Sequence, residues 1–348
     1  MNRKVVLGTG VVVVAVVTIG LYASANKGDA ATSKASVALI TDASGIDDKS
    51  FQQSAWQGLT SWAKANDVKQ GKGGYTYFQA KTSADFETNI NQGVTNGYKN
   101  IYGIGFPKTP AINAAAKKYP KNNFMIIDDI AKKRQNVVSV TFHTEQSSYL
   151  AGVAAAKTTK TNQLGFIGGM ASAVVKTFET GFIAGAKSVN PDIKVDVQYV
   201  GDFADAGKAK TIAASMYQNG SDVIYQAAGG AGAGVFTEAK DLNEKQTKAR
   251  KVWVVGVDVD QAADGAYQAT DGKSNFTLTS ATKGVGTAVK DVTERAATDK
   301  FPGGQHLVYG LKNKGVAVTR GQMSAGAWQA VQKAQKAIVA GDVKVPAK

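Results

Sequence analysis

The chain has 348 residues, 43% of them hydrophobic, and a formal net charge of +14. That is enough apolar material for a sizeable core, and the length favours two domains. The sequence has no cysteine, which excludes disulfides, thiolate metal sites, a cysteine nucleophile and acylation on cysteine, and its two histidines, His143 and His306, lack metal-ligand spacing.

The N-terminus carries the features of an export segment. Arg3 and Lys4 precede an apolar stretch at 5–22, which is followed by small residues at 23–25. A charged start, an apolar middle and a small-x-small end are typical of a secretory signal, and the apolar stretch is nearly long enough to span a bilayer. We therefore expect 1–25 to be either cleaved after Ala25 or kept as a membrane anchor. The small, polar residues at 26–36 are expected to form a linker.

The positive charge indicates an anionic neighbour, either a nucleic acid or a negatively charged cell envelope. Lysine is spread along the chain, without a dense basic run or a groove-reading motif. We therefore expect the envelope and no nucleic acid.

From residue 37 onward, apolar segments alternate with helical patterns. The predicted strands are Val37–Ile40, Tyr75–Gln79, Ile101–Ile104, Phe124–Ile127, Val137–Phe142, Leu164–Ile167, Val195–Val200, Val223–Gln226, Val252–Val257 and Phe276–Thr279. The predicted helices include Phe51–Ala65, Phe86–Asn96, Pro110–Lys118, Ser147–Lys157, Phe178–Ser188 and Ala206–Tyr217. This alternation predicts an α/β protein with parallel sheets covered by helices.

These strands are too many for one compact sheet at this length, so we expect two lobes. The first is predicted to comprise 37–143 with about 280–320, the second 144–279, and 321–348 a C-terminal helix and tail. The chain is expected to cross near Phe142–Glu145 and to return near Thr279–Lys283. Two local signals mark helix starts, a capping box of Ser50 with Gln53 and an N-cap at Thr109 before Pro110.

Polar, aromatic and glycine residues follow the predicted strands, where open α/β sheets bind their ligands. They are Asp42, Phe51, Asp128, Asp129, Phe203, Gly229–Gly234, Asp258 and Lys283. Taken singly, an aspartate after a strand is more often a helix cap, and glycines usually serve turns. Together they suit a small neutral ligand with hydroxyls and a flat ring, because carboxylates accept bonds from paired hydroxyls and aromatic faces stack on a base. The excess of carboxylates favours a nucleoside over a nucleotide.

Enzyme and regulator functions have weaker support. Gly229–Gly234 does not complete GxGxxG, and no serine lies in a GxSxG elbow. A nucleoside hydrolase remains an alternative, but it needs an activated water or nucleophile, and no histidine, cysteine or metal cluster follows the strands. A DNA-binding regulator is excluded by the export segment and by the lack of an N-terminal helix-turn-helix.

Several segments resemble the basic membrane protein (Bmp) family. TDASGIDDKSFQQSAWQGL at Thr41–Leu59 is similar to its opening signature, and agreement continues in YGIGF at Tyr102–Phe106, DVIYQAAGGAGAGVF at Asp222–Phe236 and VVGVDVDQ at Val254–Gln261. The resemblance covers essentially all of 37–320, in order. It implies a type I periplasmic-binding-protein fold, with two doubly wound lobes joined by a multi-strand hinge. It also implies a substrate-binding protein of an ABC importer, a family in which several members bind purine nucleosides.

The resemblance further implies roles for individual residues. In such nucleoside receptors the base lies between two phenylalanines, which here correspond to Phe51 and Phe203. Asp128 corresponds to the carboxylate that takes the ribose hydroxyls, and Asp42 and Asp258 to those that contact the base. The implied partners are a purine nucleoside and an ABC permease with its ATPase subunits, with no cofactor or metal.

Lys283 and the backbone of Gly230 complete the implied site. Phe178 is a second candidate for an aromatic wall, and packing at a helix start explains it equally well. Gln52 departs from the family, which usually has asparagine there, and the longer side chain could alter base preference.

The second departure is the missing lipobox cysteine, since the chain reads Leu21-Tyr22-Ala23-Ser24 at that place. We therefore expect the protein on the extracellular face of the cell membrane, held by its N-terminal segment in preference to being released. A receptor of the same fold for a sugar or sugar-like signal remains the alternative, although such a ligand leaves one phenylalanine without a partner.

Overall fold

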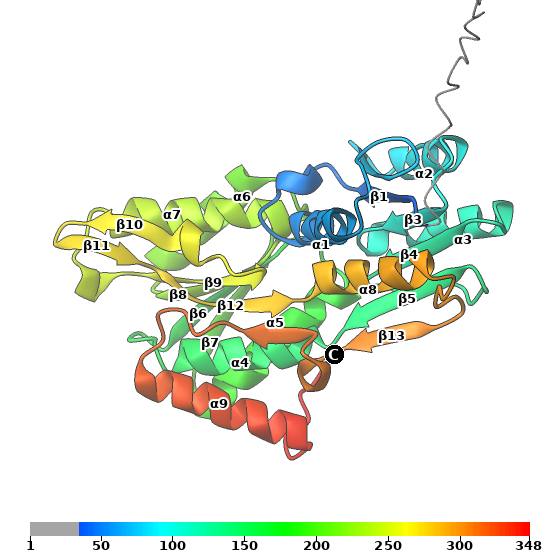
Figure 1. The fold of residues 1–348 in the computed structure, drawn as a ribbon. Coiled ribbons are helices and arrows are strands. Elements are labelled where there is room, and N and C mark those ends of the chain that lie inside the picture. The colour runs from blue at the N-terminus through cyan, green and yellow to red at the C-terminus, as the bar shows by residue number, and fades with distance from the viewer. Residues whose placement is uncertain (1–34) are drawn as a thin grey trace, which may run out of the picture. The chain divides into compact units, whose positions relative to one another are not determined.

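The computed structural model describes residues 35–348, and Figure 1 shows its ribbon. The expected signal or anchor at 1–25 and nearly all of the expected linker at 26–36 lie outside these residues. Within 35–348 no helix has both the length and the apolar character needed to cross a membrane.

The first sheet is entirely parallel and has the order β13-β5-β4-β3-β1-β2. Its strands are β1 (Val37–Thr41), β2 (Tyr75–Gln79), β3 (Asn100–Gly103), β4 (Asn123–Ile127), β5 (Val137–Phe142) and β13 (His306–Tyr309). Val37 and Leu39 belong to one core cluster, whereas Ala38 and Ile40 belong to another. Both faces are therefore covered, which is why β1 reads as a continuous apolar run.

Four helices cover this sheet: α1 (Phe51–Ala65), α2 (Asp85–Thr95), α3 (Thr109–Lys118) and α8 (Val285–Ala297). Helices α1 and α8 pack together, and so do α2 and α3. The α1 and α8 backbones approach closely, because a Cβ on Gly58 would lie 2.1 Å from the carbonyl oxygen of Gly286. We call this sheet with its four helices the first lobe.

The second sheet has the order β14-β12-β9-β8-β6-β7 and is parallel except for β14. Its strands are β6 (Gln163–Gly168), β7 (Lys194–Tyr199), β8 (Val223–Ala227), β9 (Trp253–Asp258), β12 (Thr277–Lys283) and β14 (Val316–Val318). The associated helices are α4 (Thr144–Ala156), α5 (Ala173–Val189), α6 (Ala206–Gln218), α7 (Ala233–Asn243) and α9 (Ala325–Ala340). We call this group the second lobe. Beside it, β10 (Ala266–Ala269) and β11 (Gly272–Asn275) form an antiparallel hairpin.

Three described segments connect the lobes, namely those between β5 and α4, between β12 and α8, and between β13 and β14. The predicted assignment of about 280–320 to the first lobe is wrong at both ends. Residues 277–282 pair with β9, and β14 pairs with β12, so both strands belong to the second sheet. The chain returns to the first lobe only with α8, because β12 continues past its predicted end at Thr279.

Candidate functional site

A cleft lies where the carboxyl ends of the two sheets face each other, and it holds about 600 Å3 of space, open solvent at its mouth included. In each sheet the second strand lies on one side of the first strand, and the third strand lies on its other side. The direction of the strand order therefore switches between β1 and β3 in the first sheet and between β6 and β8 in the second. Loops at such switch points form the usual binding crevice of open α/β sheets. They contribute Asp42 after β1, Gly105 after β3 and Gly229 after β8 to the lining.

The predicted site residues come together in this cleft. The lining includes Asp42, Phe51, Gln52, Asp128, Phe203, Asp258 and Lys283, together with the second aromatic candidate Phe178. Gly230 does not line it, whereas its neighbour Gly229 does, with a φ of +56°. Gly230 lies against the opposite lobe instead, since a Cβ there would be 3.2 Å from Cβ of Ser44.

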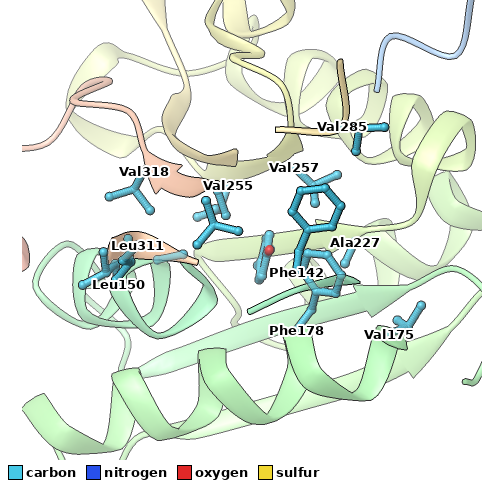
Figure 2. Packing of buried hydrophobic residues seen from close by; sticks show 14 of the residues in the cluster. Phe142, Leu150, Val175, Phe178, Ala227, Val255, Val257, Val285, Leu311 and Val318 are labelled. Atoms are coloured by element: carbon cyan, nitrogen blue, oxygen red, sulfur yellow. The ribbon is translucent and has the colours of Figure 1, made fainter. Parts of the chain in front are cut away.

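Lys283 at the end of β12 forms an ion pair with Asp128 across the cleft, and both side chains are buried. The Lys283 ammonium also lies 4.6 Å from the ring centroid of Phe51, 5.2 Å from that of Phe142 and 5.5 Å from that of Phe178. Figure 2 labels Phe142 and Phe178 among the buried hydrophobic residues. A cation among aromatic faces is stabilised by their quadrupoles. The sequence-based alternative for Phe178, packing at a helix start, does not hold, because α5 begins at Ala173 and Phe178 lies in its second turn.

Asp128 and Asp258 both adopt left-handed backbone conformations, with φ of +68° and +62°. Such conformations are uncommon outside glycine and gather at functional sites. Asp258 accepts a 2.6 Å hydrogen bond from the hydroxyl of Ser50, which belongs to the opposite lobe. Burial raises the pKa of Asp258, and the Lys283 ammonium opposes part of that rise.

The start of α1 is held by Asp48, a lining residue that the sequence interpretation missed. Its carboxylate accepts hydrogen bonds of 2.9 Å each from the backbone N–H groups of Ser50, Gln52 and Gln53. The predicted capping box is therefore wrong: the Ser50 side chain makes no cap hydrogen bond. Burial raises the pKa of Asp48 to about 6, against the effect of these three N–H groups.

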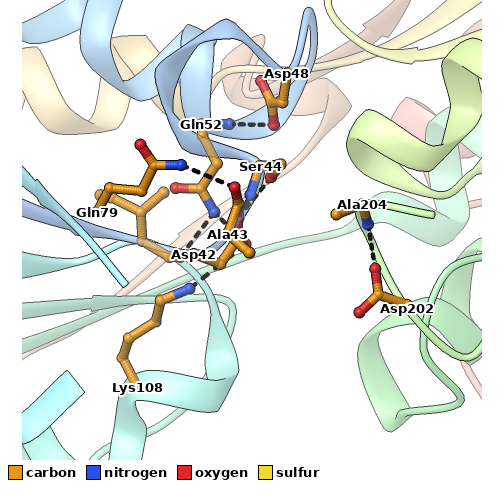
Figure 3. Close-up of polar contacts among 10 residues, drawn as sticks. Asp42, Ala43, Ser44, Asp48, Gln52, Gln79, Lys108, Asp202 and Ala204 are labelled. Atoms are coloured by element: carbon orange, nitrogen blue, oxygen red, sulfur yellow. Dashed lines mark hydrogen bonds and ion pairs between the residues drawn. The ribbon is translucent and has the colours of Figure 1, made fainter. Parts of the chain in front are cut away.

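Asp42 is the centre of a polar cluster in the first lobe (Figure 3). It accepts hydrogen bonds from the N–H and hydroxyl of Ser44, at 3.1 and 2.5 Å, and from Nε2 of Gln52 at 2.7 Å. The ammonium of Lys108 lies 3.6 Å from its Oδ2 atom. Burial lowers the pKa of Lys108, and the charge of Asp42 opposes this.

Phe203 forms an aromatic wall of the cleft on the side of the second lobe, and the position of its ring depends on a glycine. A Cβ on Gly169, just after β6, would lie 2.3 Å from two carbons of the Phe203 ring, so the ring rests directly on that backbone. Phe106 of the first lobe meets Phe203 edge-on, with ring centroids 6.4 Å apart and an interplanar angle of 73°. Phe106 and Lys108 were not identified as site residues from the sequence, although they follow β3 just as the predicted site residues follow other strands.

The chain is similar to proteins of one family along its length. The family model described as "ABC transporter substrate-binding protein PnrA-like" (Bmp) matches residues 34–348. The "ABC transporter nucleoside-binding protein BmpA" of Lactococcus lactis subsp. cremoris is 50% identical over 355 aligned residues, which cover 100% of both chains. The "CD4+ T-cell-stimulating antigen" of Listeria innocua is 46% identical, covering 100% of this chain and 99% of that protein.

A solved structure supports the fold. An ABC transporter solute-binding protein from Aeropyrum pernix superimposes with a TM-score of 0.76 at 21% identity, covering 89% of this chain and 93% of that one. The predicted type I periplasmic-binding-protein fold is confirmed by this likeness and by the two mainly parallel sheets. The similarity in sequence and the fold thus point to the same family. The chain belongs to the Bmp family of ABC transporter substrate-binding proteins.

Proposed function

We propose that this protein captures a purine nucleoside between its two lobes and delivers it to an ABC permease. One observation carries the proposal: Phe51, Phe203 and the Asp128–Lys283 pair line the same cleft. Aromatic faces suit a base, and a buried carboxylate suits the paired hydroxyls of ribose. The relative from Lactococcus lactis, named for nucleoside binding, supports the same ligand class.

The charges of the cleft favour an uncharged ligand. Its lining contains the carboxylates of Asp42, Asp48, Asp128 and Asp258, with ammonium groups from two lysines. A phosphate brought into this surplus of negative charge is repelled. We therefore expect nucleosides to bind more tightly than the corresponding nucleotides. The protein acts by binding, and its closure around the ligand supplies the affinity.

Titration calorimetry on the full chain in mild detergent tests this proposal, with guanosine, inosine, adenosine, their monophosphates, free bases and ribose as ligands. We expect nucleosides to bind, and Phe51→Ala to weaken them by about 1–3 kcal/mol through lost stacking. Phe301→Ala, which truncates a half-buried ring outside the cleft, is the matched control. Binding of ribose alone supports the sugar-receptor alternative, and release of free base from inosine indicates a hydrolase.

The same proposal places the protein at the extracellular face of the membrane, attached through 1–25. A tether keeps the receptor near its permease at high effective concentration. Cell fractionation tests the attachment, and uptake of labelled nucleoside by cells with and without the protein tests delivery. Recovery of the protein entirely in the medium excludes the tether, and unchanged uptake excludes the transport role.

A further inference from the structure

Lys108 is fully buried, yet its ammonium makes no hydrogen bond within residues 35–348. The carboxylate oxygen of Asp42 lies 3.6 Å away, and the ring centroid of Phe86 lies 4.8 Å away. A buried donor without an acceptor is unfavourable, the more so when it is charged. Because Lys108 lines the cleft, a bound ligand can supply the missing acceptor.

An unused acceptor belongs to the same cluster. The Gln52 amide donates to Asp42 at 2.7 Å and to the carbonyl oxygen of Ile104 at 3.3 Å, which fixes the orientation of the amide. Its Oε1 atom is buried and accepts no hydrogen bond from the described residues. The cluster around Asp42 therefore holds both a free donor, on Lys108, and a free acceptor, on Gln52.

These groups lie at the edge of the ring on which a base is proposed to stack. A Cβ on Gly105 would lie 3.4 Å from Cε1 of Phe51 and 3.8 Å from Nζ of Lys108. The edge of the Phe51 ring and the Lys108 ammonium therefore both lie close to this one position beside Gly105. The other ammonium near Phe51, on Lys283, is already paired with Asp128. Lys108 is thus the lysine placed to contact the edge of a base.

We propose that Lys108 donates a hydrogen bond to a carbonyl oxygen on the base, while Gln52 or Asp42 accepts from the adjacent ring N–H, so that 6-oxopurine nucleosides are preferred over adenosine. This inference rests on the proposed function. Inosine and guanosine carry a carbonyl acceptor at position 6 beside an N–H donor at position 1. In the same pose, adenosine turns its amino group toward the ammonium and a lone pair toward the side-chain oxygens, which gives two mismatches.

Calorimetric titration of the full chain with inosine and adenosine tests this preference. Wild type is expected to bind inosine at least tenfold more tightly, because hydrogen bonds to charged groups separate matched from mismatched ligands by about tenfold to a hundredfold. Lys108→Met is expected to weaken the binding of inosine by that factor and the binding of adenosine much less. The ratio of the two dissociation constants should therefore approach one. Lys108→Arg keeps a cation and is expected to retain part of the preference.

Two further measurements guard against a merely structural effect. Lys64→Met replaces an exposed lysine of α1 and is expected to leave both affinities unchanged. Purine riboside, which has no substituent at position 6, is expected to bind wild type as weakly as adenosine does, and this needs no variant. Equal binding of inosine and adenosine by wild type, or equal losses in Lys108→Met, overturns this inference alone. Failure of every nucleoside to bind wild type overturns the proposed function and this inference with it.

Discussion

Ser50 of the first lobe donates a 2.6 Å hydrogen bond to Asp258 of the second lobe. Both residues are buried: Ser50 directly precedes helix α1 of the first lobe, and Asp258 is the last residue of β9 in the second sheet. The same loop of the first lobe makes two more contacts with the second lobe. The Lys49 ammonium forms an ion pair with Asp264 at 3.2 Å, and the backbone carbonyl oxygen of Lys49 accepts a hydrogen bond from the side-chain amide of Gln261. The loop before α1 thus joins the lobes through the protein's own side chains.

Ser50→Ala is expected to lower the free energy of unfolding by about 2 kcal/mol, since it removes a buried hydrogen bond to a carboxylate. Urea unfolding at neutral pH measures the change. Ser215→Ala, at an exposed position of α6, provides the matched control and should be nearly neutral. Equal effects of the two substitutions would show that the contact between the lobes contributes no stability.

The pKa of Asp48, raised by burial from 3.8 to about 6, makes stability depend on pH. Between these values the folded state binds more protons than the unfolded state, so the free energy of unfolding falls as pH rises from 3.8 to 6. The loss from this group is about 3 kcal/mol, at about 1.36 kcal/mol per pKa unit.

Asp48→Asn cannot titrate at this position. Its stability relative to wild type is therefore expected to improve by up to about 3 kcal/mol between pH 4 and pH 7, on top of a constant loss from the weakened helix cap. Unfolding curves across this range measure the difference, with the exposed Asp342→Asn as the control. Parallel pH profiles for wild type and Asp48→Asn contradict the prediction.

The buried pair of Lys283 and Asp128 predicts strong coupling between the two residues. Lys283→Met or Asp128→Asn alone leaves an uncompensated buried charge and is expected to destabilise the protein by about 3–5 kcal/mol. The double variant removes both charges and should recover most of this loss. Additive effects in a double-mutant cycle, measured by urea unfolding, would show that the pair is not coupled.

Gly169→Ala is expected to weaken nucleoside binding about tenfold, because the new methyl group occupies the place of the Phe203 ring. Gly326→Ala is the matched control, because within 35–348 no atom outside its chain neighbours and its own helix backbone lies within 4 Å of its Cβ position in α9. That substitution should leave affinity unchanged and stabilise the helix by about 0.5–1 kcal/mol. Calorimetry and thermal melts separate the two effects, and unaltered affinity in Gly169→Ala argues against Phe203 as a binding wall.

The regular elements were largely predictable from the sequence, because strands covered on both faces read as short apolar runs. Strand Val137–Phe142, which is buried at all but one position, and helix Phe51–Ala65 have the predicted bounds. The edge strand β13 was missed because it contains His306 and lacks such a run. β14 has only three residues and pairs on one side, so pattern alone gives little signal for it.

Within the site, the residues that could be predicted from the sequence were those that follow an apolar strand. Asp128 and Asp258 follow apolar strands, and their position in the sequence placed them correctly in the cleft. Local hydrogen bonding was harder to predict, because partners distant in the chain compete for the same side chains. The hydroxyl of Ser50 donates to Asp258, and that of Thr109 donates to Asp129 at 2.6 Å, so neither acts as the predicted cap.

The order of strands in the two sheets has a consequence for how the chain acquires its structure. The first lobe needs β13 for its edge, the second needs β14, and both strands lie within the last fifty residues. A chain that emerges N-terminus first cannot complete either lobe until nearly all of it is available. Loss of the segment after residue 300 therefore removes a strand from both sheets at once, and neither lobe is obtained intact by cutting the chain at a single point.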